Sequence, residues 1–478
     1  MSLRERTIKG LTWSGTSQVI TQISQFSITA ILARLLSPND FGLLGMTVVF
    51  TNFINIFCEM GVSGALIQRQ DLDERHYSSV FWLNIMAGIV LTFITIAISP
   101  YIAKFYSEPK LKPILMLISI NFFITSFTIV QKTILSKDMD FKKIAVIDIV
   151  AVIISGVVGI YFAYLGYGVW SLIYRLLALT SISMILLWAL STWKPKFIFS
   201  MDAIKDIFSF SANLMGFNVI NYIARNIDNL LIGKFLGSEP LGYYTLAYRL
   251  MLYPIQNISG VIGKVMFPAF SRIQNDLEKV RTTYLKMIKA ISLVTFPLMF
   301  GLFAVAPEFV NVLFGEKWQP TVMLIRILCI CGIFQSVGTT VGNIILSQGR
   351  AGLQFQMQLV GTILVTIFIV VGLKWDIIGV SISYVVYTTF FVHLSFYITN
   401  KLIKLSYVKF YYKMLPSYAM GAVTAVSLML TRQFFALTTL PTLITLICTG
   451  LLIYISLLTV SKNIIIKDRR FFVTLFKP

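Results

Sequence analysis

The sequence predicts an all-helical, polytopic membrane protein built from two similar halves. Three observations predict this class: a high apolar content, a series of long apolar runs, and a turn motif that occurs twice. The 478 residues are 57% hydrophobic and only 13% charged, whereas a soluble protein carries about 25% charged residues. Because a soluble fold could not bury so much apolar surface, we expect the chain to lie in a lipid bilayer.

Fourteen apolar runs are long enough to cross about 30 Å of hydrocarbon as helices, which takes roughly 20 residues each. Their length favours helices over the roughly 10-residue alternating strands of membrane barrels. The first run is also too long for the apolar core of a secretory signal, so we expect it to remain as a span. The predicted spans are 11–36, 41–67, 80–103, 114–135, 144–165, 168–192, 208–236, 242–270, 283–306, 320–347, 353–373, 376–400, 411–431 and 437–460.

The net charge of +20 orients the chain. In a soluble protein such an excess would suggest a nucleic-acid partner, but in a membrane protein the positive-inside rule explains it. With the N-terminus inside, the inner segments carry roughly three times as many Lys and Arg as the outer ones. We therefore expect both termini in the cytoplasm and no nucleic-acid partner. The four cysteines show neither metal-ligand nor disulfide spacing, so no metal site and no cofactor are expected.

A polar turn between two apolar runs occurs twice, at residues 33–44 and again at 233–244. Arg34 aligns with Lys234, and Gly42 aligns with Gly242. Further short matches follow in the same order, so the collinear series indicates two copies of one six-span unit. Six is even, so the copies share an orientation, and a substrate path is expected between them. The predicted parts are an N-lobe at 1–192, a cytoplasmic linker at 193–207, a C-lobe at 208–400, and two further spans with a tail at 401–478.

Ionisable side chains inside a membrane are costly, so each is a candidate for function. Arg225 lies near the middle of the seventh span, and Asp228 follows at i+3 on the same face. Either the two form a self-neutralising pair, or Arg225 is a cation held in a cavity. Asp228 and Glu59 are candidates for coupling to a proton or to sodium. Asp148 is close to the inner interface and is expected to snorkel, as are Lys264 and Lys289. Further candidate cations are Arg249, Arg34, Arg175 and Arg326.

The first span carries a polar stripe on an otherwise apolar helix. Gln18, Gln22 and Gln25 recur at three- and four-residue intervals, and the seventh span has an asparagine stripe that includes Asn221. The stripe indicates either hydrogen bonding between helices or the wall of a wet cavity. Arginine suits phosphate, and amides suit sugar hydroxyls, so a substrate with both groups is expected. A nucleotide-sugar carrier would fit the same pattern.

The turn "RLLSPNDFGLL" at 34–44 and the segment "EMGVSGALIQR" at 59–69 resemble a known family. They are similar to the polysaccharide-biosynthesis, Wzx-like branch of the multidrug/oligosaccharidyl-lipid/polysaccharide exporter superfamily, especially the exporters of teichuronic and colanic acids. The resemblance extends over nearly the whole chain in span number and spacing.

This resemblance implies a flippase that moves an undecaprenyl-diphosphate-linked oligosaccharide from the inner to the outer leaflet of a bacterial cytoplasmic (inner) membrane. It further implies two lobes in a V arrangement, alternating access, no enzymatic activity, and membrane lipids as neighbours. A polysaccharide polymerase and chain-length machinery would be partners. Arg225 and then Arg249 would hold the diphosphate, ahead of Arg34, Arg175 and Arg326, and the glutamine stripe would face the glycan. The alternative is a cation-coupled small-molecule or drug antiporter of the same superfamily.

Overall fold

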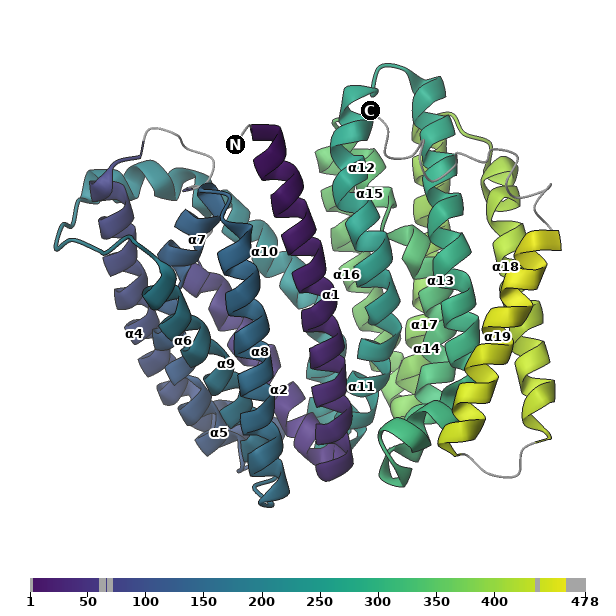
Figure 1. Cartoon of the computed structure of the whole chain (residues 1–478), viewed down its shortest axis with the longest axis horizontal. Helices are drawn as coiled ribbons and strands as arrows, with labels where there is room; N and C mark the ends of the chain where they lie inside the picture. The colour runs from purple at the N-terminus through teal and green to yellow at the C-terminus, as the bar shows by residue number, and fades with distance from the viewer. Residues whose placement is uncertain (1–2, 60–65, 67–71, 435–438, 461–478) are drawn as a thin grey trace. The chain divides into compact units, whose positions relative to one another are not determined.

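The computed structural model describes residues 3–59, 66, 72–434 and 439–460, and this part of the chain is helical with no strand. The chain divides into two compact units, residues 1–242 and 243–478. Helices of the first unit are drawn from purple to teal in Figure 1. They are α1 (Leu3–Leu35), α2 (Pro38–Glu59), α4 (Glu74–Tyr106), α5 (Leu111–Ile118), α6 (Ile120–Ser126), α7 (Ile129–Lys137), α8 (Phe141–Tyr164), α9 (Val169–Leu190), α10 (Met201–Phe235) and the start of α11 (Ser238–Pro254).

The second unit continues from α11 and is drawn from teal to yellow (Figure 1). Two short 3-10 turns, Glu316–Trp318 and Leu373–Trp375, precede α14 and α17. Its elements are the π-helical turn Ile255–Ser259, α12 (Gly260–Arg272), α13 (Leu277–Leu313), α14 (Gln319–Gly338), α15 (Val341–Ser347), α16 (Ala351–Gly372), α17 (Asp376–Leu402), α18 (Tyr407–Arg432) and α19 (Leu440–Val460).

Ten helical segments of the described chain are long and apolar enough to cross a membrane, which makes this a multi-pass membrane protein. One of these segments, residues 351–402, joins α16 and α17. Helices α1, α10 and α11 are not among the ten, and all three carry polar side chains along their length. Each predicted run overlaps a described helix, but the number of fourteen spans stays a prediction.

Three of the predicted spans are interrupted, which the apolar pattern did not indicate. The run 320–347 is divided between α14 and α15. The run 114–135 is divided among α5, α6 and α7. At the two breaks, the hydroxyls of Ser119 and Thr128 donate to the backbone oxygens of Met116 and Thr125, three residues earlier. Such bonds give the backbone an alternative to the regular helix ladder. The run 242–270 is interrupted by the π-helical turn that follows Pro254, because proline lacks the N–H that the helix needs.

The core of the first unit forms where α1 packs on α8 and α8 packs on α9. Ile28 and Leu32 of α1 are buried against Val152 of α8 and Leu172 of α9. Gly156 of α8 allows this close packing, since a Cβ there would overlap the Ile28 side chain. The apolar face of α1 is thereby used for packing, and its polar stripe lies on another part of the helix surface.

The connection from α9 to α10 is held against α4 by hydrogen bonds to its backbone. The Trp82 indole donates to the Lys196 carbonyl at 2.8 Å, and the Lys196 amide donates to the Ser78 hydroxyl at 3.0 Å. The Ser200 amide donates to the Ser79 hydroxyl at 2.8 Å. These bonds fix a segment without regular secondary structure to the first unit.

The repeated turn brings two glycines together within the first unit. A Cβ at Gly42 would overlap the Ser238 carbonyl, and a Cβ at Gly242 would overlap the Pro38 carbonyl. The first turn is also capped, because Ser37 and Asp40 exchange backbone-to-side-chain bonds of 2.9 and 3.3 Å. The two turns therefore pack closely against each other, and the packing at the two glycines is reciprocal.

The second unit is built around α13, which packs on α14, α18 and α19. An ion pair of 2.6 Å joins Glu308 of α13 to Arg432 of α18. Glu308 is 1% exposed, so this carboxylate depends on its partner for neutralisation. The pair fixes one end of α18 to the rest of the unit.

The division after Gly242 differs from the predicted linker at 193–207. Helix α10 packs on α2 and α4, and the Tyr222 hydroxyl donates to the Val49 carbonyl at 2.7 Å. These contacts place α10 with the first compact unit, although the repeat pattern assigned it to the C-lobe. Two lobes of six spans stay a prediction.

Candidate functional site

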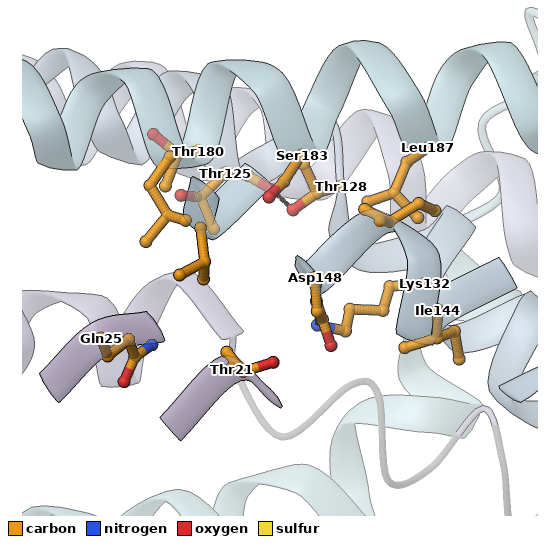
Figure 2. Close-up of a pocket in the computed structure, with 13 residues that line it drawn as sticks. Thr21, Gln25, Thr125, Thr128, Lys132, Ile144, Asp148, Thr180, Ser183 and Leu187 are labelled. Carbon is orange, nitrogen blue, oxygen red and sulfur yellow. Dashed lines mark hydrogen bonds and ion pairs between the residues drawn. The ribbon is translucent and has the colours of Figure 1, made fainter. Parts of the chain in front are cut away.

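A cavity of about 390 Å³ lies inside the first unit, among α1, α6, α7, α8 and α9. Figure 2 shows threonine and serine side chains on one side, Thr21 and Gln25 of α1 on another, and Lys132 beside Asp148. This volume is within the roughly 300–1,000 Å³ typical of small-molecule sites. The lining residues are Thr21, Gln25, Thr125, Thr128, Lys132, Ile144, Ile147, Asp148, Val152, Leu179, Thr180, Ser183 and Leu187.

A second cavity of about 260 Å³ follows α1 and α8 next to the first. The two cavities share the residues Thr21, Gln25, Ile144 and Asp148. Gln18 and Gln22 line the second cavity. The structure thus brings the three predicted glutamines together along cavity walls, while their contact with a substrate stays a prediction. Asn221 is half-buried on α10 and does not line either cavity.

The charged side chains among the lining residues are Lys132 of α7 and Asp148 of α8. Their Nζ and Oδ1 atoms are 3.3 Å apart, and their side chains are 53% and 39% exposed. A half-exposed pair of this kind contributes little to stability. Its effect on the cavity is to supply one positive and one negative group whose charges cancel.

Most hydroxyls around the cavity already donate to the protein. Thr21 donates to the Ser17 carbonyl at 2.6 Å, and Thr128 donates to the Thr125 carbonyl at 2.7 Å. Thr180 donates to the Asn121 side-chain oxygen at 2.6 Å. Each oxygen keeps acceptor capacity after donating its one proton. The wall is consequently rich in acceptors.

Arg225 and Asp228 do not form the self-neutralising pair that the sequence left open. Arg225 is exposed on α10, whereas Asp228 is 3% exposed and accepts a bond of 2.8 Å from the Asn229 amide. The ion pairs of the described residues include none between Arg225 and Asp228. The Asp228 carboxylate therefore does not neutralise the Arg225 guanidinium.

The other predicted cations of the first unit have different surroundings. Arg34 is exposed in the last turn of α1. Arg175 is half-buried on α9, and its side-chain carbons fill the space beside Gly159 of α8. Lys234, the repeat partner of Arg34, donates to the Phe105 carbonyl at the end of α4. A cation at a helix C-terminus is favourable, which gives Lys234 a structural role.

Arg249 and Arg326 lie in the second unit. Arg249 is exposed on α11. Arg326 is half-buried on α14, donates to the Phe303 carbonyl at 3.4 Å, and lies 5.8 Å from the centre of the Phe303 ring. The five predicted arginines are thus divided between the units, with Arg34, Arg175 and Arg225 in the first.

Sequence reasoning missed the ion pair in the cavity. Asp148 was expected to snorkel because it lies within a few residues of the inner end of its predicted span, and Lys132 was not considered. The two residues are sixteen positions apart, on the two helices that a short turn joins. This spacing was the available signal for the ion pair. The side chain of Glu59 and most of the 59–69 segment lie outside the described residues. The described residues contain no group of His, Cys, Asp and Glu that could hold a metal ion.

The sequence matches known proteins over most of its length. Residues 31–323 match the family described as "Polysaccharide biosynthesis protein". The chain is 32% identical over 362 residues to the teichuronic acid biosynthesis protein TuaB of Bacillus subtilis (strain 168), a match that covers 74% of each protein. It is 29% identical over 411 residues to the lipopolysaccharide biosynthesis protein WzxC of Escherichia coli (strain K12), covering 84% of this chain and 82% of that protein.

Two kinds of solved membrane transporters share the fold. The lipid II flippase MurJ in an inward closed conformation has a TM-score of 0.77 over 95% of this chain and 100% of that chain, at 15% identity. An inward-facing multidrug resistance MATE transporter of the MOP superfamily has a TM-score of 0.65 over 80% of this chain and 94% of that chain, at 16% identity. At these identities the likeness shows the fold alone, which is that of a polytopic helical membrane protein.

Proposed function

The chain belongs to the polysaccharide biosynthesis protein family, and on this premise we propose that it is a flippase for a lipid-linked oligosaccharide. The family match carries this proposal, because relatives over most of the chain are named for teichuronic acid and lipopolysaccharide biosynthesis. The cargo would be an undecaprenyl-diphosphate-linked glycan that moves from the inner to the outer leaflet of the cytoplasmic membrane by alternating access between two lobes. Both termini would be cytoplasmic.

The physical task of such a protein is to shield polar groups from hydrocarbon. A diphosphate and many sugar hydroxyls are too costly to move through lipid without partners. Arg225 supports a role in phosphate binding, because it is exposed on α10 and is not ion-paired with Asp228. Arg249 is exposed in the same way on α11. Transport requires no covalent bond to change, so we infer that the chain is not an enzyme.

The glutamine stripe of α1 supports contact with the glycan. Gln18, Gln22 and Gln25 line two cavities that share lining residues and in which amides and hydroxyls predominate among the polar groups. A drug antiporter is the alternative within the superfamily, and the fold alone does not distinguish it. The family match over residues 31–323 favours the flippase.

Export of surface polysaccharide tests this function and the role of Arg225. A strain lacking the chain should lose its surface polysaccharide, and the wild-type chain should restore it. Arg225→Ala should reduce export by roughly 10- to 100-fold, since charge-assisted hydrogen bonds to phosphate contribute about 1.5–3 kcal/mol. Arg225→Lys should retain part of the export, because the charge remains without the planar fork.

A surface arginine provides the control. Arg75 is 71% exposed at the start of α4, so Arg75→Ala should export as the wild type does at equal protein level. Unchanged export with Arg225→Ala would remove Arg225 from the site. Surface polysaccharide that persists without the chain would refute the proposed function itself.

A further inference from the structure

We propose that the cavity inside the first unit is a subsite for one uncharged sugar ring, in which Asp148 accepts hydrogen bonds from sugar hydroxyls. This inference rests on the proposed function and assigns one part of the cargo to one place in the fold. The subsite is formed by α1, α6, α7, α8 and α9 and contains the Lys132–Asp148 ion pair (Figure 2).

The charge of the cavity argues against the diphosphate as its ligand. Lys132 and Asp148 are the charged groups among the lining residues, and at 3.3 Å they neutralise each other. A phosphate beside Lys132 would also approach the Asp148 carboxylate, and like charges at close range repel. The site therefore fits a group without net charge.

The hydrogen-bonding character of the wall points to a ligand with many donors. The hydroxyls of Thr21, Thr128 and Thr180 already donate their protons to protein oxygens, so they meet a ligand as acceptors. The bond from Lys132 is to Oδ1 of Asp148, which leaves acceptor capacity on this carboxylate. Phosphate oxygens only accept, so these three hydroxyls and the Asp148 carboxylate offer them no donor. Sugar hydroxyls can donate to every one of these groups.

The remaining wall suits the body of a sugar ring. Aliphatic side chains form an apolar part of the lining and can contact the C–H groups of the ring, while the Gln25 amide supplies both a donor and an acceptor. These aliphatic residues are Ile144, Ile147, Val152, Leu179 and Leu187. Because Lys132 and Asp148 are half-exposed, the site is accessible to a hydrophilic group.

The position of the cavity agrees with loading from the cytoplasmic side. Asp148 lies two turns after the start of α8, and Lys132 lies in the first turn of α7, five residues before the end of that helix. In the predicted topology, the turn between these helices faces the cytoplasm, where positive charge is in excess. A glycan attached to a lipid of the inner leaflet would meet this site first.

Binding of defined probes to the purified full-length chain in lipid nanodiscs tests the subsite. The probes are geranylgeranyl diphosphate alone, the same lipid carrying one glucose or one N-acetylglucosamine, and the same lipid carrying one glucuronic acid. At least one of the neutral-sugar probes should bind the wild type roughly tenfold more tightly than the sugarless lipid, as one charge-assisted hydrogen bond would give. The glucuronic acid probe should gain less, because its carboxylate approaches Asp148.

Substitutions then show which residues give the neutral-sugar probes their tighter binding. Asp148→Asn should reduce the advantage of the neutral-sugar probe over the sugarless lipid to less than about threefold. Gln25→Ala, which keeps the ion pair, should reduce the same advantage. Asp138→Asn is the matched control, since Asp138 is exposed in the turn after α7 and does not line the cavity. Equal melting temperatures of the variants and the wild type would show that lost binding does not come from misfolding.

The outcomes separate the subsite from the function. If all probes bind the wild type equally, or if glucuronic acid binds best, the subsite is wrong and the flippase proposal stands. If Asp148→Asn keeps the full sugar advantage, Asp148 is not an acceptor for the sugar and the subsite is wrong. If no probe binds the wild type, the proposed function is wrong, and the subsite with it.

Discussion

Gly42→Ala should destabilise the protein, although alanine is the better helix former. A methyl group at Gly42 would overlap the Ser238 carbonyl and would lie 2.9 Å from the Ser238 Cα, whereas ordinary van der Waals contact begins near 3.4 Å. The opposing atoms belong to the backbone, so no side-chain rotation can relieve the overlap. The start of α2 and the start of α11 would have to separate.

The size of the effect follows from two opposing contributions. Overpacking costs about 1–3 kcal/mol, and the rigid backbone places Gly42 at the upper end of that range. Replacing glycine by alanine inside a helix returns about 1 kcal/mol. A net loss of about 2 kcal/mol should lower the melting temperature by roughly 4–8 °C. Gly242→Ala should behave alike, because its methyl group would overlap the Pro38 carbonyl.

Thermal unfolding of the purified protein in detergent measures this loss, with Gly301→Ala as the control. A Cβ at Gly301 in α13 would meet nothing within 4 Å. That variant should melt at or slightly above the wild-type temperature. If Gly42→Ala melts within 1 °C of wild type while Gly301→Ala behaves as expected, the close approach of the two turns does not limit stability, and the reasoning is refuted.

Three further predictions concern other contacts. Arg432→Ala should leave the buried Glu308 carboxylate without its partner and lower the free energy of unfolding by about 2–3 kcal/mol. This is less than for a fully buried pair, because Arg432 is 35% exposed. The double variant with Glu308→Gln should regain stability, and failure to regain it would contradict this cause. Tyr222→Phe should cost about 1 kcal/mol in thermal unfolding through the lost bond to Val49, and an unchanged melting temperature would show that this bond does not hold α10. A reporter fused after Lys404 should give a cytoplasmic signal, and a periplasmic signal would break the fourteen-span topology.

The sequence predicts the fold class well because a bilayer imposes a simple rule on it. Apolar length determines where helices lie, and the predicted run 376–400 differs from α17 by only two residues at its end. The two turns with Gly42 and Gly242 were also predictable, because the same polar motif stands between two apolar runs in each case. The interruptions within runs were not, since Ser119 and Thr128 break the helices through short side-chain bonds that no hydropathy pattern records.

The candidate site was predictable only in part. The glutamine stripe could be found because it lies on one helix with a regular period. The Lys132–Asp148 pair could not be predicted as part of a site, because it lines a cavity only through the packing of α1 and α9 around it. The Glu308 carboxylate was missed for a similar reason, as its partner Arg432 is more than a hundred residues away in sequence.

The hydrogen bonds that hold the α9–α10 connection on α4 have a consequence for biosynthesis. Their partners, Ser78, Ser79 and Trp82, are made more than a hundred residues before Lys196 and Ser200. A chain emerging from the ribosome can therefore fasten this connection as soon as Ser200 is available, since N-terminal parts fold first. Five candidate membrane-spanning segments of the described chain precede Ser200. They would then be anchored in the membrane before most of the second unit has been translated.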